Sequence, residues 1–275
     1  MVKPFLPSQR FIETEETIVR RVHQNSLPWC NPALRILNWN IAKNNRAAFG
    51  SHQRVRSWLS EFAAILERYN PDLIFLQEVR LCAETQHLGE LTDMGWNFAP
   101  NFIDTYHNCY AGVLTAAKAS CLTRKAVKTQ HYEPVTQTPK VSLVVEYPFP
   151  TSAQTLLTIN SHLINFVDLA TFKAQLHALE GAIAPHTGAI IFSGDFNTWN
   201  RSRWLMLAGM AGRLGLTQAK FPPKDAQNIK RFLLSPPLDH VFYRGLHQNM
   251  IHAKVLNHAI SSDHKPMIVE FSGEM

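Results

Sequence analysis

Long hydrophobic runs are missing from this 275-residue sequence: no apolar stretch approaches the roughly 20 residues that a membrane-spanning helix needs. The first eight residues, Met1 to Ser8, lack the uninterrupted apolar segment of a secretion signal. Internal repeats and low-complexity tracts are also missing. With 45% hydrophobic and 17% charged residues, disorder is disfavoured for most of the chain. We therefore expect a soluble protein of the cytoplasm.

Cysteine is scarce, and its four occurrences show no C-x-x-C pair and no regular spacing: Cys30, Cys82, Cys109 and Cys121. This pattern disfavours both a zinc knuckle and a framework of disulfides. We expect reduced and mostly packed thiols, as in a cytoplasmic protein.

Acidic residues are fewer than basic ones, 21 against 27, which gives a formal charge of +6 and a pI near 9.2. A basic chain favours encounter with polyanions such as nucleic acid, phospholipid headgroups or phosphorylated metabolites. The charge alone identifies no partner. We expect the protein to act as a monomer.

The pattern of apolar residues predicts one α/β domain at residues 33–275, preceded by a polar, proline-punctuated arm at residues 1–32. Between Gln53 and Tyr69 the apolar positions recur at three- and four-residue steps, which is typical of an amphipathic helix. Further helices are expected at 168–184 and 201–213, and strands at 34–40, 72–78, 109–117, 141–147, 154–162, 188–195, 238–243, 249–256 and 266–271. Many strands and few helices predict two sheets packed face to face with the helices outside.

Polar side chains with catalytic potential stand at the ends of several of these apolar runs. Glu78 ends one predicted strand, and Asp195 and Asn197 follow another on one face, because strand side chains alternate. Magnesium takes oxygen ligands, usually one or two carboxylates with water, so Glu78 and Asp195 are the natural suppliers. The alternative for Asp195 and Asn197 is an ordinary turn after a strand, where Gly, Asp and Asn are all common.

Two histidines are candidates for proton transfer. His264 has a reference pKa near ~6.5 and precedes the last predicted strand, and Asp239 is the carboxylate expected to orient it. His162 ends the strand predicted at 154–162, where its imidazole could donate to a phosphate oxygen or protonate a leaving oxygen; Asn165 follows it. The alternative is that each of these residues makes only local caps, which is common for any single histidine among thirteen.

Together these segments resemble the endonuclease/exonuclease/phosphatase superfamily from Leu34 to Phe271, with the motifs in the expected order. The resemblance implies a DNase I-like, four-layer α/β/β/α sandwich of two mainly antiparallel sheets between outer helices, with the site at one rim. By the same resemblance Asn40 helps to position metal and phosphate, Glu78 binds the divalent cation, and Asp263 is the acidic neighbour near the metal. The resemblance also implies that Asp195 and Asn197 orient the attacking water and contact the phosphate. It implies that Asp239 holds the base histidine, which is His264. Family mechanisms differ on whether the aspartate or the histidine takes the proton.

The resemblance also bears on the branch of the superfamily. His162 disfavours an abasic-site endonuclease, where a tyrosine is usual, and the tryptophan and arginines after Asn197 most resemble a bacterial YafD-like branch. This cluster, Trp199, Arg201, Arg203 and Trp204, could anchor a phosphate or stack a base. Its alternative is the solvated start of the helix at 201. Lys43, Asn44, Arg46 and Arg80 could complete a basic collar.

The favoured interpretation is a Mg²⁺-dependent phosphodiesterase, with Mn²⁺ as an alternative ion, that acts as a nuclease on DNA or RNA. The second is hydrolysis of a phospholipid, sphingomyelin or phosphoinositide headgroup by the same chemistry. An exposed hydrophobic hairpin beside the site would favour it, but the nearest candidate, residues 101–107, is too polar. The third, a catalytically dead scaffold, is disfavoured because every catalytic position carries a competent side chain.

Overall fold

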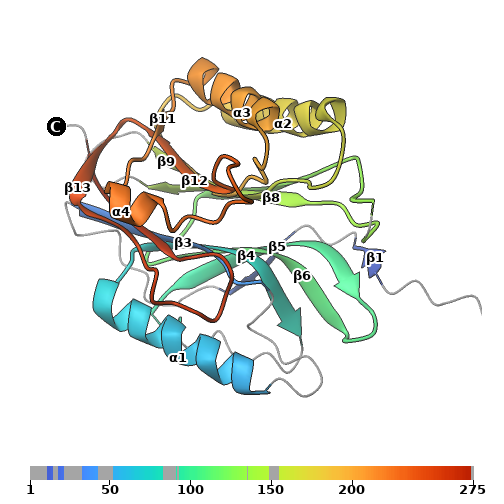
Figure 1. The fold of residues 1–275 in the computed structure, drawn as a ribbon, viewed down its shortest axis with the longest axis horizontal. Coiled ribbons are helices and arrows are strands. Elements are labelled where there is room, and N and C mark those ends of the chain that lie inside the picture. Colours follow the sequence, from blue (N-terminus) through green and yellow to red (C-terminus); the bar gives the residue numbers. More distant parts are fainter. Residues whose placement is uncertain are drawn as a thin grey trace, which may run out of the picture.

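The computed structural model describes residues 11–14, 18–21, 33–42, 52–82, 91, 93–134, 136–148 and 155–273. These residues form two β-sheets packed face to face, with helices on both outer faces (Figure 1). The four-layer sandwich expected from the sequence is therefore confirmed. The expected Lys43, Asn44 and Arg46 of the basic collar lie outside the described residues.

The first sheet has the strand order β1-β5-β6-β4-β3-β14-β13, and β2 also pairs with β5. Its strands are β1 (Phe11–Glu13), β2 (Val19–Arg21), β3 (Ala33–Asn40), β4 (Leu73–Cys82), β5 (Gly95–Asp104), β6 (Cys109–Ala117), β13 (Leu246–Val255) and β14 (Met267–Gly273). The short strands β1 and β2 come from the expected N-terminal arm and pair antiparallel with β5. The domain boundary at residue 33 stays a prediction.

The second sheet has the strand order β11-β12-β10-β9-β8-β7. Its strands are β7 (Thr123–Lys128), β8 (Val141–Pro148), β9 (Thr155–His162), β10 (Ala189–Asp195), β11 (Thr217–Gln218) and β12 (Asp239–Arg244). Strands β5 and β7 were not expected from the sequence. Strand β7 lies at a sheet edge and its side chains are exposed or half-buried, so it lacks the apolar alternation that marks a strand.

The helices cover the outer faces because each has an apolar side. Helix α1 (His52–Tyr69) buries Trp58, Phe62 and Ile65 against the first sheet. Helices α2 (Leu169–Ile183) and α3 (Arg201–Arg213) lie together on the second sheet, as Figure 1 shows, and α4 (Pro223–Ala226) is a short turn before β12. None of the helices in the described ranges is long and apolar enough to cross a membrane.

Each sheet contains one parallel pair of strands among antiparallel neighbours. Strand β3 runs parallel to β4, and β9 runs parallel to β10. Because the carboxyl ends of parallel strands meet at one edge of a sheet, Asn40 and Glu78 lie near one another, as do His162 and Asp195. The two edges face the same rim of the sandwich, and this brings segments from four strands together.

A layer of carboxamides joins the two sheets beneath that rim. The Gln77 Nε2 donates to Asn38 Oδ1 within the first sheet (3.0 Å) and to Asn160 Oδ1 of the second (2.8 Å). In return Asn160 Nδ2 donates to the backbone oxygens of Leu76 and Leu114. All three carboxamide side chains are buried, so these bonds satisfy groups that water cannot reach. They fix the relative position of the two sheets next to the site.

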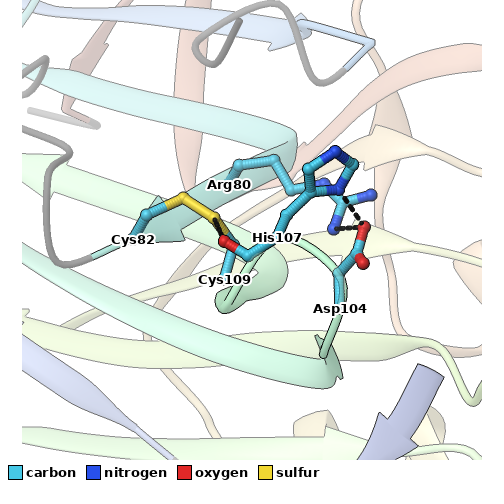
Figure 2. Close-up of a disulfide and its surroundings, with 5 residues drawn as sticks. All are labelled: Arg80, Cys82, Asp104, His107 and Cys109. Carbon is cyan, nitrogen blue, oxygen red and sulfur yellow. Dashed lines mark hydrogen bonds and ion pairs between the residues drawn. A yellow bond between two sulfur atoms is a disulfide. The ribbon is translucent and has the colours of Figure 1, made fainter. Parts of the chain in front are cut away.

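One expectation about cysteine is wrong. Cys82 and Cys109 form a disulfide between the neighbouring strands β4 and β6, where the two residues are register partners (Figure 2). They are 27 residues apart, and only the register of these strands, which the spacing of the cysteines does not reveal, brings them together. Of the other two cysteines, Cys121 is a free thiol, and Cys30 lies outside the described residues.

Candidate active site

The centre of the site is a buried pair, Asp239 and His264. Asp239 begins β12, and both of its carboxylate oxygens lie within 3.0 Å of the His264 Nδ1. The other ring nitrogen, Nε2, lies 3.8 Å from the Asp195 Oδ2. Because Nδ1 faces a carboxylate, it carries the proton, and Nε2 is directed towards Asp195. His264 is thus hydrogen-bonded to Asp239, as the expected orienting role of that carboxylate requires, and is in ion-pair contact with Asp195.

Asp195 is held by the amides on either side of it. The Asn40 Nδ2, at the end of β3, donates to Asp195 Oδ2 (2.9 Å), and the backbone N–H of Asn197 donates to Oδ1 (3.0 Å). The Asn197 side chain donates instead to the backbone oxygen of Leu163 (2.8 Å). The carboxylate is therefore fixed in one orientation by both sheets.

The close approach of β9 and β10 depends on Gly194. Its φ of +149° lies where side chains are rarely tolerated, and a Cβ there would overlap the backbone oxygen of Ser161. Glycine therefore lets the backbones of β9 and β10 approach closely at this position. It places Asp195 directly beside His162, its register partner on β9.

Glu78 projects into the site from an irregular part of β4. The register of β4 against β6 shifts between Leu76 and Val79, and Glu78 has a left-handed φ of 56°. A non-glycine residue in this conformation stores strain, which is common where a side chain must be aimed at a functional site. The Glu78 Oε1 lies 4.0 Å from His162 Nε2, which in turn lies 3.6 Å from Asp195 Oδ2.

The electrostatics of the site follow from burial and from charge pairing. Burial alone would lower the pKa of His264, but the charge and hydrogen bond of Asp239, with Asp195 and Asp263, raise it to about 10. Burial lowers the pKa of His162 to about 4, with Lys140 adding to the effect. Burial also raises the pKa of Asp195, against the opposing effect of His264 and His162. The site therefore joins a histidine whose pKa is raised by its carboxylate partners to an aspartate whose pKa is raised by burial.

A pocket of about 230 Å³ opens above these residues. Glu78, His162, Asp195, Asn197 and His264 line it, together with the cations Lys140 and Lys230 and the aromatic side chains Phe102, Phe166 and Phe232. Asp263 also lines the pocket, but its carboxylate is 60% exposed and pairs with Lys230 at 2.9 Å. Its expected place beside a metal stays a prediction.

The residues expected to bind substrate lie in different environments. The Asn165 Oδ1 accepts from Trp199 Nε1 (2.8 Å), which makes the two a bonded pair, with Asn165 lining the pocket. Arg201 is exposed at the start of α3. Trp204 is packed against His240, with ring centroids 4.9 Å apart.

Two of the expected phosphate anchors are buried and engaged within the protein, which corrects that expectation. The Arg203 guanidinium donates to the backbone oxygens of Asn197 and Ile164 (both 3.0 Å), and the residue has no exposed surface. Arg80 is 7% exposed and donates to Asp104, which also pairs with His107 (Figure 2). The sequence pattern of arginines could not distinguish a free guanidinium from one that supports a loop.

His240, next to Asp239, is a further buried residue that fixes the site. The Gln218 Nε2 donates to its Nδ1 (3.0 Å), so its proton lies on Nε2 and is donated to Thr198 Oγ1 (2.9 Å). The Thr198 hydroxyl donates in turn to Pro237. Burial lowers the pKa of His240 to about 3, so the ring is neutral. It ties the Asn197–Thr198 segment to β12.

The donor chemistry fits a hard divalent cation. Asp195, Asp239 and His264 place ligand atoms within 4.8 Å of one another. Asp239, however, gives both oxygens to His264. The better ligands are the carboxylate oxygens of Glu78 and Asp195, because both residues line the pocket and carboxylates are hard donors of the kind that Mg²⁺ and Mn²⁺ prefer. A cation here would stabilise the ionised form of Asp195.

Sequence reasoning missed several residues that the structure brings to the site. Lys140 and Lys230 lie in no recognisable sequence motif. Gln77 and Asn160 lie beside the predicted site residues Glu78 and His162 but were given no role. The signal for the two carboxamides was a polar residue at the inward position of an otherwise apolar strand, which requires a buried partner.

Comparisons with known proteins agree with this geometry. Residues 37–264 match the model of the Endonuclease/Exonuclease/phosphatase family. Similar solved structures include an endonuclease/exonuclease/phosphatase from Bacteroides vulgatus, with 13% identity over 88% of this chain and 99% of that one, at a TM-score of 0.67. A second, from Beutenbergia cavernae, has 16% identity over 88% of this chain and 72% of that one, at a TM-score of 0.65. The human Nocturnin catalytic domain, solved with a bound sulfate anion, has 18% identity over 96% of this chain and 97% of that one, at a TM-score of 0.64. Identities this low show a shared fold.

Proposed function

The chain belongs to the endonuclease/exonuclease/phosphatase family, whose members are phosphoesterase hydrolases, and from this premise we propose that it is a metal-dependent phosphodiesterase. The observation that carries the proposal is the chain of contacts Asp239–His264–Asp195, which ends in a pocket that Glu78 also lines. Such a chain can hold and move a proton beside a phosphate. The placement within a YafD-like branch stays a prediction.

In the proposed mechanism, Glu78 would hold a Mg²⁺ ion, or Mn²⁺, together with the Asp195 carboxylate that Asn40 positions. The ion would supply charge neutralisation at the phosphate. Asp239 holds the His264 ring, and the Asp195/His264 pair takes the proton of the attacking water. Because the two groups lie 3.8 Å apart, they titrate as a pair rather than independently. His162 and Asn197 flank Asp195, where they can hold phosphate oxygens.

The first candidate substrate is nucleic acid. The positive charge of the chain supports it. Lys140 and Lys230 also line the pocket, each paired with a carboxylate, Glu133 at 3.4 Å and Asp263 at 2.9 Å. The second candidate is a phospholipid, sphingomyelin or phosphoinositide headgroup. One observation favours it: the loop that borders the pocket exposes the apolar residues Phe232, Leu233 and Leu234.

The test is Mg²⁺-dependent nicking of supercoiled plasmid, run beside a panel of phospholipids and phosphoinositides. His264→Ala should lower turnover by ~100-fold or more, the usual contribution of a positioned acid or base. His258→Ala, which changes an exposed histidine six residues away, is the matched control and should keep its activity. EDTA should abolish turnover, and Mg²⁺ or Mn²⁺ should restore it. Full activity in EDTA, or in His264→Ala, would refute the mechanism.

The expected cytoplasmic location and the Cys82–Cys109 disulfide make opposite predictions, because cytosolic thiols are kept reduced. Alkylation of free thiols in intact cells, followed by mass spectrometry of the two cysteines, distinguishes them. A disulfide found intact in cells would remove the cytoplasmic location from the proposal.

A further inference from the structure

Three consecutive apolar residues are exposed in the loop between α4 and β12. Phe232 is 48% exposed, Leu233 95% and Leu234 101%. A single exposed apolar side chain is ordinary, but an exposed run of three is the feature that marks an interaction surface. We call residues 232–234 the apolar tip.

The apolar tip is held in a defined turn. The Phe232 N–H donates to Ser235 Oγ (2.9 Å), and the Ser235 N–H donates to the Phe232 oxygen (2.8 Å). Leu233 has a left-handed φ of 50°, a conformation in which Asn or Gly is favoured. A leucine is therefore less stable there than an asparagine, and its side chain gains no packing in return. Leucine at this position makes sense if its side chain contacts something outside the chain.

The apolar tip borders the candidate active site. Lys230, Phe232 and Leu238, which flank or belong to the tip, line the pocket that contains His264. On the other loop at this pocket Phe166 is 61% exposed and also has a left-handed φ, 54°. A surface that covers the tip would therefore meet the mouth of the pocket.

The charges around the apolar tip identify the partner. Residues 220–234 contain four cations, Lys220, Lys224, Lys230 and Arg231, and one anion, Asp225. A second anion, Asp263, pairs with Lys230 at 2.9 Å, so the balance around this segment is still positive. The Lys230 amine lies over the Phe232 ring, 5.8 Å from its centroid. An apolar projection flanked in sequence by cations is the pattern of segments that insert at the surface of a bilayer with anionic lipids. Nucleic acid favours aromatic stacking, to which aliphatic Leu233 and Leu234 contribute nothing.

We propose that the apolar tip inserts into the headgroup region of an anionic lipid bilayer, with the neighbouring cations at the headgroups and the pocket mouth facing the membrane. The inference goes beyond the proposed function, because binding to the bilayer requires no hydrolysis. Membrane binding and phosphodiester cleavage can therefore fail separately.

The experiment is co-sedimentation of the full chain with vesicles of phosphatidylcholine, with and without phosphatidylglycerol, in EDTA so that no lipid is hydrolysed. The test variant is Leu233→Asn/Leu234→Ser, because asparagine suits the left-handed position and should keep the fold, as thermal melting would verify. The control is Leu205→Gln, an exposed leucine on the outer helix α3. We expect binding to the anionic vesicles, and binding at least about tenfold weaker in the double variant only.

Two results would overturn the inference: a wild-type chain that stays in the supernatant with anionic vesicles, or a double variant that binds them as well as the wild type. A double variant that keeps vesicle binding but loses binding to single-stranded DNA would assign the tip to nucleic acid instead. Plasmid nicking by a chain that does not bind vesicles would leave the proposed function standing without this inference. Vesicle binding with no hydrolysis of any substrate would leave this inference standing without the proposed function.

Discussion

Replacement of Arg203 by methionine tests whether this arginine binds substrate or supports the site. Methionine keeps the apolar stem but leaves the backbone oxygens of Asn197 and Ile164 without their donors. Two unpaired buried acceptors cost about 2 kcal/mol each. Loss of the cation over the Phe172 ring, 4.2 Å away, removes about 2 kcal/mol more.

Part of this loss is offset because the charged guanidinium no longer has to be buried. Burial lowers the Arg203 pKa to about 10 from 12.5, which corresponds to about 3 kcal/mol against the charged form. The net loss of unfolding free energy is then about 3 kcal/mol, with a fall in the melting midpoint of roughly 6–10 °C.

Thermal melting and steady-state kinetics together distinguish the two roles. A supporting arginine predicts a lower melting midpoint and a lower kcat, because the Asn197 segment moves, with little change in KM. Arg201→Met, an exposed neighbour on the same helix turn, is the control and should melt like the wild type. An unchanged midpoint in Arg203→Met with a raised KM for a polyanionic substrate would refute the supporting role.

Three further predictions concern stability and the metal. The pKa of His240 is about 3 in the fold and ~6.5 when unfolded, so the unfolded chain takes up the proton first and stability falls as the pH drops below 6.5. Urea unfolding should show that this residue lowers the unfolding free energy by about 2 kcal/mol between pH 6.5 and pH 5. In His240→Gln the unfolding free energy should depend less steeply on pH, and an equally steep dependence in the variant would contradict the prediction. Reduction of Cys82–Cys109, which are 27 residues apart, should lower the unfolding free energy by about 3 kcal/mol in the wild type. The double serine variant should not respond to the reductant, and a response there would place the effect elsewhere. Glu78→Gln should raise the Mg²⁺ concentration needed for half-maximal activity at least tenfold, as a metal titration measures; an unchanged titration would exclude Glu78 as a ligand.

Much of the fold could be predicted because its elements carry strong apolar patterns. The helices at α1, α2 and α3 and the buried strands β3, β10 and β14 were expected within a few residues of where they lie, since each buries a regular set of side chains. Strand β5 was missed because Pro100 and the adjacent register shift interrupt its pattern. The family, expected from the order of the motifs, is confirmed by the match over residues 37–264.

The environment of the site residues could not be predicted as well as their identity. Polar residues at strand ends lie close together in space, because strand ends meet at a sheet edge. Asp195 and His264 could be predicted as site residues for this reason. A motif says nothing about which long side chains fold back into the protein, so Arg80 and Arg203 looked like free cations. The pairing of Cys82 with Cys109 and the exposure of Leu233 depend on strand register and loop conformation, which have no counterpart in local sequence.

The carboxamide layer between the sheets has a consequence for how the protein opens. The Gln77 Nε2 donates to Asn160 Oδ1 and the Asn160 Nδ2 donates to the Leu76 oxygen, so separating the sheets leaves buried donors and acceptors without partners on both sides. The two sheets therefore belong to one cooperative unit, and the slowest hydrogen exchange should extend through β4 and β9 alike. Glu78 lies at the irregular part of β4, and His162 is the last residue of β9. A fragment containing only one sheet would carry half of the catalytic groups and an unsatisfied interior, and activity would return only when both fragments reassemble.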